Sequence, residues 1–93
     1  MLSERRRLMA QTPNPFTAED VLRLLDAQGH RCAYCGTALN GRFDIDHILP
    51  LSRGGSNAAD NICCACRRCN RSKGTLTAEE YRQKLARLSH LAS

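Results

Sequence analysis

The stretch CAYC at residues 32–35 and the stretch CRRC at residues 66–69 enclose the segment DIDHILPLSRGGSNAADNI at residues 44–62. Two close pairs of thiolates that a loop brings together are the usual ligands of a tetrahedral structural zinc ion. The spacing therefore predicts a Zn²⁺ site made by Cys32, Cys35, Cys66 and Cys69. The enclosed segment, with its Asp-His pair, becomes the candidate for chemistry.

The six cysteines leave a second interpretation open, because short secreted proteins also use cysteines as disulfide frameworks. The first residues, MLSERRRLMAQTPNPF, carry basic side chains without an apolar segment after them, and no apolar run approaches membrane-spanning length. We therefore expect a cytoplasmic protein with reduced thiols and no membrane contact. Cys63 and Cys64 are expected to pack as small apolar residues, and Cys64 remains open as an alternative zinc ligand.

Length and charge set two further expectations. A chain of 93 residues is one domain with a marginal apolar core, and a structural zinc can add about 10–16 kcal/mol to its stability. The formal charge is +5. Basic residues gather at Arg5–Arg7 and within 67–73, where the acids are absent, and such clusters suit a phosphate backbone. A solvated helix face is the alternative for each cluster.

We divide residues 1–93, as a single domain, into four parts. Residues 1–16 are a basic arm and linker that the two nearby prolines end. Residues 17–30 hold a helix of about 18–28, capped by Thr17, whose apolar face is Val21, Leu22, Leu24 and Leu25. Residues 31–75 are the zinc-bound core. Residues 77–91 are a C-terminal helix that begins with the capping box Thr77-Ala78-Glu79-Glu80.

The core is expected to contain two strands and a short helix. Residues 42–48 predict a strand with Phe43 and Ile45 on one face and Asp44 and Asp46 on the other. A turn-rich loop leads to a second strand at 61–64, and a helix at 67–73 ends at Gly74. In the C-terminal helix, Tyr81, Leu85 and Leu88 mark the expected buried stripe. The fold class is α+β, a zinc-stapled ββα module with flanking helices.

Asp46 and His47 have the chemistry that phosphodiester hydrolysis needs. A carboxylate is a hard ligand for Mg²⁺ or Mn²⁺, and an imidazole can take a proton from water. Neighbours in a strand point to opposite faces, so both can act on one phosphate only where the strand bends or ends, which Pro50 permits. Taken alone, an Asp-His pair is more often structural, and an asparagine such as Asn61 is more often a turn residue.

With these residues the chain resembles the HNH endonucleases, the ββα-metal nucleases. The resemblance covers residues 32–74 and is carried by CAYC at 32–35, DHILPLSRGGS at 46–56, DNI at 60–62 and CRRCNRSKG at 66–74. It implies that His47 is the general base and that Asp46 binds the catalytic divalent ion. It also implies that Asn61 holds the loop after the base by bonding backbone and that Asn70 is the second metal ligand.

The resemblance also implies the substrate and the metals. The motif is of HNN type, and the neutral oxygen of Asn70 favours Mg²⁺ or Mn²⁺ in the catalytic site, with Zn²⁺ purely structural. DNA is the expected partner, held mainly through its backbone, and a homodimer or a protein partner is left open. From charge and position we expect Arg68, Arg71 and Lys73 to contact flanking phosphates and Arg53 to contact the scissile one.

The leading hypothesis is a metal-dependent DNA endonuclease or nickase. A zinc-nucleated DNA-binding module without catalysis is the main alternative, and it would need the basic residues but neither a base nor hard-metal ligands. The disulfide alternative predicts a protein without zinc that unfolds in reductant. The Asp46-His47 pair, taken together with Asn61 and Asn70, favours the enzyme.

Overall fold

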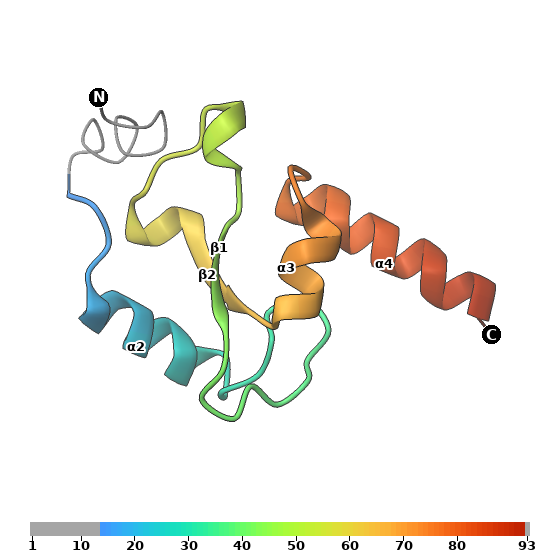
Figure 1. Ribbon diagram of the computed structural model, residues 1–93, viewed down its shortest axis with the longest axis horizontal. Helices are drawn as coiled ribbons and strands as arrows, with labels where there is room; N and C mark the ends of the chain where they lie inside the picture. Colours follow the sequence, from blue (N-terminus) through green and yellow to red (C-terminus); the bar gives the residue numbers. More distant parts are fainter. Residues whose placement is uncertain (1–13, 93) are drawn as a thin grey trace.

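A two-stranded sheet with helices on both sides forms the centre of the protein (Figure 1). The computed structural model describes residues 14–92, so Arg5–Arg7 and most of the basic arm lie outside the described residues. In chain order the elements are α2 (Ala18–Ala27), β1 (Asp44–His47), the short 3₁₀ turns η1 (Leu51–Arg53) and η2 (Ala59–Asn61), β2 (Ile62–Ala65), α3 (Arg67–Lys73) and α4 (Ala78–Ala92). This is the α+β order expected from the sequence.

The two strands pair antiparallel, with Asp44 opposite Ala65 and His47 opposite Ile62. Both differ from the predicted ranges. β1 is shorter than 42–48 because Arg42 belongs to a turn, in which its N–H bonds to the carbonyl of Leu39. β2 begins one residue later than predicted because Asn61 ends η2. The sheet is therefore only four residues long, and β1 ends at the Asp-His pair.

Helix α2 covers β2 on one side of the sheet and closes its outer edge (Figure 1). The capping box of Thr17 and Asp20 starts the helix, and Val21 and Leu25 enter the core. Leu24 is half-buried, but Leu22 is exposed, so the predicted apolar face was too wide. The side-chain amide of Gln28 accepts from the N–H of Cys64 and donates to its carbonyl. These two bonds pair backbone groups that β2 presents at its outer edge.

The two faces of β1 differ in burial. Asp46 is buried, whereas Ile45 is exposed at the rim of a cavity. The alternation of the strand is as expected, and the acidic face is the one that α3 covers on the second side of the sheet (Figure 1). A carboxylate on a buried face requires polar partners, so the helix that packs there must supply them.

Helix α4 begins with the capping box of Thr77 and Glu80, as predicted. The N–H of Ala78 bonds to the carbonyl of Ile48, which fixes the start of α4 to the chain just after β1. Tyr81 is buried and meets the ring of Tyr34 edge to face. Leu88 is exposed, contrary to the predicted stripe, because the later turns extend beyond the core (Figure 1). Among residues 14–92, no helix has the length and apolar character to cross a bilayer.

Candidate zinc centre and active site

The four predicted zinc ligands lie together. The sulfur atoms of Cys32, Cys35, Cys66 and Cys69 are all within 4.8 Å of one another. Cys35 and Cys66 are separated by 3.8 Å, which matches the sulfur–sulfur edge of about 3.8 Å in a zinc tetrahedron with bonds of about 2.3 Å. A disulfide bond would need about 2.05 Å. The tetrad therefore fits a closed structural zinc site.

Backbone N–H groups contact two of the four sulfur atoms. The N–H groups of Tyr34 and Cys69 point at the sulfur atoms of Cys32 and Cys66, both at 3.4 Å. Burial of the Cys32 thiol opposes its ionisation, but backbone N–H groups outweigh this effect and lower the pKa of Cys32 to about 7. Thiolates are the form that binds zinc, so this lowered pKa favours a metal at Cys32, whereas burial raises the pKa of Cys66 and raises that of Cys69 to about 12.

The two remaining cysteines are not part of the tetrad. Cys64 is buried on the α2 side of β2, with its sulfur near the carbonyl of Val21, so it is not an alternative zinc ligand. Cys63 is buried against Tyr34 and Asp46, and burial raises the pKa of its thiol to about 11. Both pack as small side chains, as the sequence indicated.

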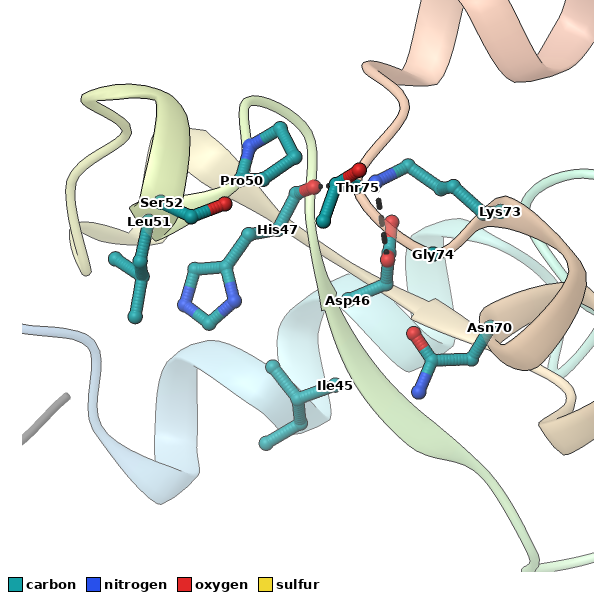
Figure 2. A pocket seen from close by; sticks show the side chains of 10 residues that line it. All are labelled: Ile45, Asp46, His47, Pro50, Leu51, Ser52, Asn70, Lys73, Gly74 and Thr75. Atoms are coloured by element: carbon teal, nitrogen blue, oxygen red, sulfur yellow. Dashed lines mark hydrogen bonds and ion pairs between the residues drawn. The ribbon is translucent and has the colours of Figure 1, made fainter.

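A cavity of about 510 Å³ opens where β1 ends (Figure 2). It is bounded by β1, by the turn around η1 and by the C-terminal half of α3 with the residues after it. The lining residues are Ile45, Asp46, His47, Pro50, Leu51, Ser52, Asn70, Lys73, Gly74 and Thr75. Three of the four residues predicted to be catalytic, Asp46, His47 and Asn70, therefore border one space.

Asp46 is held by three side chains on the α3 side of β1. Its Oδ1 lies 3.2 Å from the ammonium of Lys73, and its Oδ2 accepts a hydrogen bond from the hydroxyl of Tyr34 and lies near the thiol of Cys63. Lys73 is itself buried and also donates to the carbonyl of His47 at 2.8 Å. Burial and the bond to Asp46 raise the pKa of Tyr34 above its usual range, so the hydroxyl keeps its proton.

Asn70 faces the same side of β1 from helix α3. Its Nδ2 donates to Oδ2 of Asp44 at 3.1 Å, and its amide oxygen lies on the side of Asp46 (Figure 2). A carboxylate and an amide oxygen are suitable donors for a hard divalent cation such as Mg²⁺. The donor set therefore fits such an ion, which would share Asp46 with the ammonium of Lys73.

His47 lies on the other side of β1, beside Leu51 and Ser52 (Figure 2). Its Nε2 is 2.7 Å from Oδ1 of Asn57, a buried residue of the loop between η1 and η2. The ring thus approaches the cavity from the side opposite to Asp46. Adjacent residues of a strand are expected to diverge in this way, and both reach the cavity because β1 ends at His47.

Asn61 does not line the cavity but bonds the loop around it. Its Oδ1 accepts from the N–H of Leu49 at 2.9 Å, and its Nδ2 donates to the carbonyls of Leu49 and Ser56. These three bonds join the residues just after His47 to the end of the glycine turn. The geometry is that of a side chain replacing backbone partners, which is the arrangement expected of Asn61.

Comparisons with known proteins cover the part of the chain that forms this site. Residues 32–86 match the family model described as HNH endonuclease. The chain belongs to the HNH endonuclease family. The matched region extends from the first zinc ligand through both strands and α3 into α4, so it includes the cysteine tetrad and every residue that lines the cavity.

Two curated relatives of this chain are CRISPR-associated endonucleases Cas9. The Cas9 of Actinomyces naeslundii is 41% identical over 69 residues, which cover 70% of this chain and 6% of that protein. The Cas9 of Corynebacterium diphtheriae is 41% identical over 49 residues, which cover 50% of this chain and 4% of that protein. The chain therefore spans only a small part of the length of these relatives.

The basic residues of this HNH domain do not all have the exposure expected of phosphate ligands. Arg71 is exposed on α3, and Arg68 is exposed beside the thiol of Cys35. Arg53 binds Glu80 and the carbonyl of Thr75, so it joins η1 to the start of α4. The prediction that Lys73 contacts a phosphate was wrong, because its ammonium is buried between Asp46 and the carbonyl of His47.

The sequence did not indicate that Tyr34 and Asn57 belong to the HNH site. It did indicate Lys73, but as a phosphate contact and not as a buried partner of Asp46. A signal existed for Lys73. It follows Asn70 by three residues on a helix, and residues with this separation share a face. Asn57 follows Gly-Gly-Ser and has the composition of an ordinary turn residue, and nothing local distinguishes Tyr34 from other residues of a zinc knuckle.

Proposed function

We propose that this chain is a metal-dependent DNA endonuclease or nickase domain that hydrolyses phosphodiester bonds at the cavity beside β1. The observation that supports this most is the placement of His47 on one side of β1 and of Asp46 and Asn70 on the other, around one cavity. DNA is the proposed substrate because the family consists of endonucleases and the domain is basic.

The two-sided arrangement suits displacement at phosphorus. In such a reaction the attacking and the leaving oxygen are roughly in line on opposite sides of the phosphorus atom. A base for the attacking water and a group that stabilises the leaving oxygen must then approach from opposite directions. His47 and the Asp46–Asn70 pair diverge around the end of β1 in the way that this chemistry requires.

In the proposed mechanism, His47 accepts a proton from the water that attacks phosphorus. Asp46 and Asn70 would hold the divalent ion, Mg²⁺ or Mn²⁺, which supplies a Lewis acid for the phosphate oxygens when bound. Lys73 balances the buried carboxylate of Asp46. Asn61 fixes the loop that follows His47 through its bonds to Leu49 and Ser56.

Zinc has a different role in this proposal. The sulfur tetrad of Cys32, Cys35, Cys66 and Cys69 would bind Zn²⁺ with a closed shell that leaves no position for water. Because Cys66 caps α3 and the helix carries Asn70 and Lys73, the tetrad positions the catalytic helix against β1. Arg68 and Arg71, which are exposed on this helix, are the proposed contacts to flanking phosphates, and Arg53 stays a candidate contact to the scissile phosphate.

A cleavage assay tests the proposal. Supercoiled plasmid is incubated with the zinc-loaded chain in Mg²⁺, Mn²⁺ or Ca²⁺, or without an added divalent ion, and nicked and linear products are measured. We expect cleavage in Mg²⁺ or Mn²⁺ and none without an added ion, with zinc content unchanged; EDTA is avoided because a chelator would also remove the structural zinc. Binding of DNA without cleavage in any of these ions would instead indicate the catalytically silent DNA-binding module.

The metal ligands are tested by titrating the divalent ion with Asn70→Ala. This change removes an oxygen donor and should raise the metal concentration that gives the half-maximal rate. Ser72→Ala, on the same helix but with its hydroxyl near Lys84 on the surface, is the matched control and should titrate like the wild type. An unchanged titration for Asn70→Ala would remove this residue as a ligand.

A further inference from the structure

Asn57 is the buried residue that contacts the proposed base. Its side-chain oxygen lies 2.7 Å from Nε2 of His47, and only 2% of the residue is exposed. His47 lines the cavity and Asn57 does not. The amide therefore touches the ring from behind, from the protein interior, and it is not placed to touch a substrate.

An amide oxygen can only accept a hydrogen bond. A neutral imidazole beside it must therefore carry its proton on Nε2, which donates to Asn57. The other nitrogen, Nδ1, then keeps its lone pair. In a histidine the partner of one ring nitrogen decides which nitrogen is basic. The contact with Asn57 thus selects one of the two neutral tautomers and also limits rotation of the ring.

The loop that carries Asn57 is fixed on both sides. On one side, Asn61 bonds the carbonyl of Ser56, and Gly55 lies so close to Leu49 that a Cβ there would be 1.8 Å from its carbonyl oxygen. On the other side, the carbonyl of Asn57 accepts from the N–H of Phe16, which packs against the core. The side chain of Asn57 is therefore held in position before any substrate binds.

We infer that Asn57 is a positioning residue that holds His47 with its proton on Nε2 and presents Nδ1 as the atom that takes the proton from water. This inference rests on the proposed role of His47 as general base. It adds which ring nitrogen acts and which side chain selects it. It also gives a function to the turn Gly54–Asn57, whose geometry brings the amide behind the ring.

The first test is the tautomer of His47 in the wild-type chain. Long-range ¹H–¹⁵N correlation on the ¹⁵N-labelled, zinc-loaded protein at about pH 8, where an ordinary imidazole is neutral, distinguishes a protonated ring nitrogen from a bare one. We expect a protonated Nε2 and a bare Nδ1. A proton found on Nδ1 would overturn the inference, whatever the variants do.

The second test compares two replacements of Asn57. Asn57→Asp keeps an oxygen acceptor and loses the NH₂ group, whereas Asn57→Leu loses both. We expect Asn57→Asp to keep the tautomer. We expect Asn57→Leu to show averaged ring-nitrogen shifts and a rate at saturating DNA lower by about 10- to 100-fold, by analogy with side chains that orient metal-binding histidines. The affinity for DNA should stay the same.

Asn40→Asp is the control. It makes the same chemical change as Asn57→Asp, but at an exposed turn outside the cavity, and it should leave both the tautomer and the rate unchanged. A wild-type tautomer and rate in Asn57→Leu would contradict the role of Asn57. Failure of the proposed function gives a different result. The wild type would then cleave no DNA, or His47→Ala would cleave like the wild type, while the His47 ring of the wild type still carried its proton on Nε2.

Discussion

The cysteine tetrad and the proposed catalytic cavity are built in contrasting ways within the same 43 residues, 32–74. Each half of the tetrad comes from residues three apart, and local backbone N–H groups point at its sulfur atoms. The cavity instead depends on polar contacts between segments distant in the chain, such as Tyr34 with Asp46 and Lys73 with His47. The first centre is encoded by local spacing and the second by tertiary packing.

The contrast predicts different consequences of mutation. Loss of a zinc ligand should affect the whole fold, because both strands and α3 lie between or beside the two pairs. Loss of one polar contact at the cavity should affect the position of a catalytic side chain or the balance of one buried charge.

Replacement of a tetrad residue should have the largest effect. We expect Cys66→Ser to unfold the domain, because a structural zinc contributes about 10–16 kcal/mol in small zinc domains and Cys66 also caps α3. Far-UV circular dichroism and zinc content measure the result. Cys63→Ser, outside the tetrad, is the matched control and should keep one zinc per chain. A folded Cys66→Ser protein with a full equivalent of zinc would contradict the assignment.

Removal of the ammonium at Lys73 should be the next largest change. In Lys73→Met the buried carboxylate of Asp46 loses its cation, and breaking a buried ion pair costs about 3–5 kcal/mol. Chemical denaturation measures this loss. Lys84→Met, at a lysine that contacts Ser72 on the surface, is the control and should cost little. If Asp46→Asn combined with Lys73→Met is no more stable than Lys73→Met alone, the two groups are not coupled.

A methyl group at Gly55 should disturb the loop that carries Asn57. The new Cβ would lie 1.8 Å from the carbonyl oxygen of Leu49, and we expect a loss of about 1–3 kcal/mol, as for other overpacked sites, together with slower cleavage. Gly41→Ala is the control. Its added Cβ meets nothing within 4 Å, although the backbone there is also restricted by a positive φ. Equal losses of cleavage in both variants would argue against a specific role for the Gly55 contact.

Replacement of an exposed leucine should have the smallest effect. Leu88 is 51% exposed on α4, so Leu88→Gln should change the free energy of unfolding by no more than about 0.5 kcal/mol. Leu25→Gln, at a buried position of α2, should be far more costly. A large loss for Leu88→Gln would show that this face of α4 is covered by something outside residues 14–92.

The same contrast explains what could be predicted from the sequence. The tetrad, α3, the N-cap at Thr17 and the capping box at Thr77 were predicted correctly because residues close in the chain define them. Leu22 and Leu88 were placed wrongly in the core, because helical periodicity identifies an apolar face but not how far the neighbouring elements cover it. The Gln28 amide that closes the edge of β2 has no local sequence signal.

The cavity could be predicted only in part. Asp46, His47 and Asn70 were expected to meet, and they line one cavity. The burial of Lys73 was missed because a basic helix suggests phosphate contacts, whereas tertiary packing turns this one ammonium toward Asp46. Asn57 was missed because a residue in a glycine turn gives no indication of a partner ten residues earlier in the chain. The catalytic roles of all these residues stay predictions.

The cleavage rate of His47→Ala decides whether His47 is the general base of this domain. His47→Ala and the wild type are compared on supercoiled plasmid in Mg²⁺ or Mn²⁺, at saturating DNA and equal zinc content. We predict that the variant folds, binds zinc and DNA like the wild type, and loses at least about 100-fold in rate, the lower end of what a general base contributes. Cleavage by the variant at the wild-type rate would contradict it.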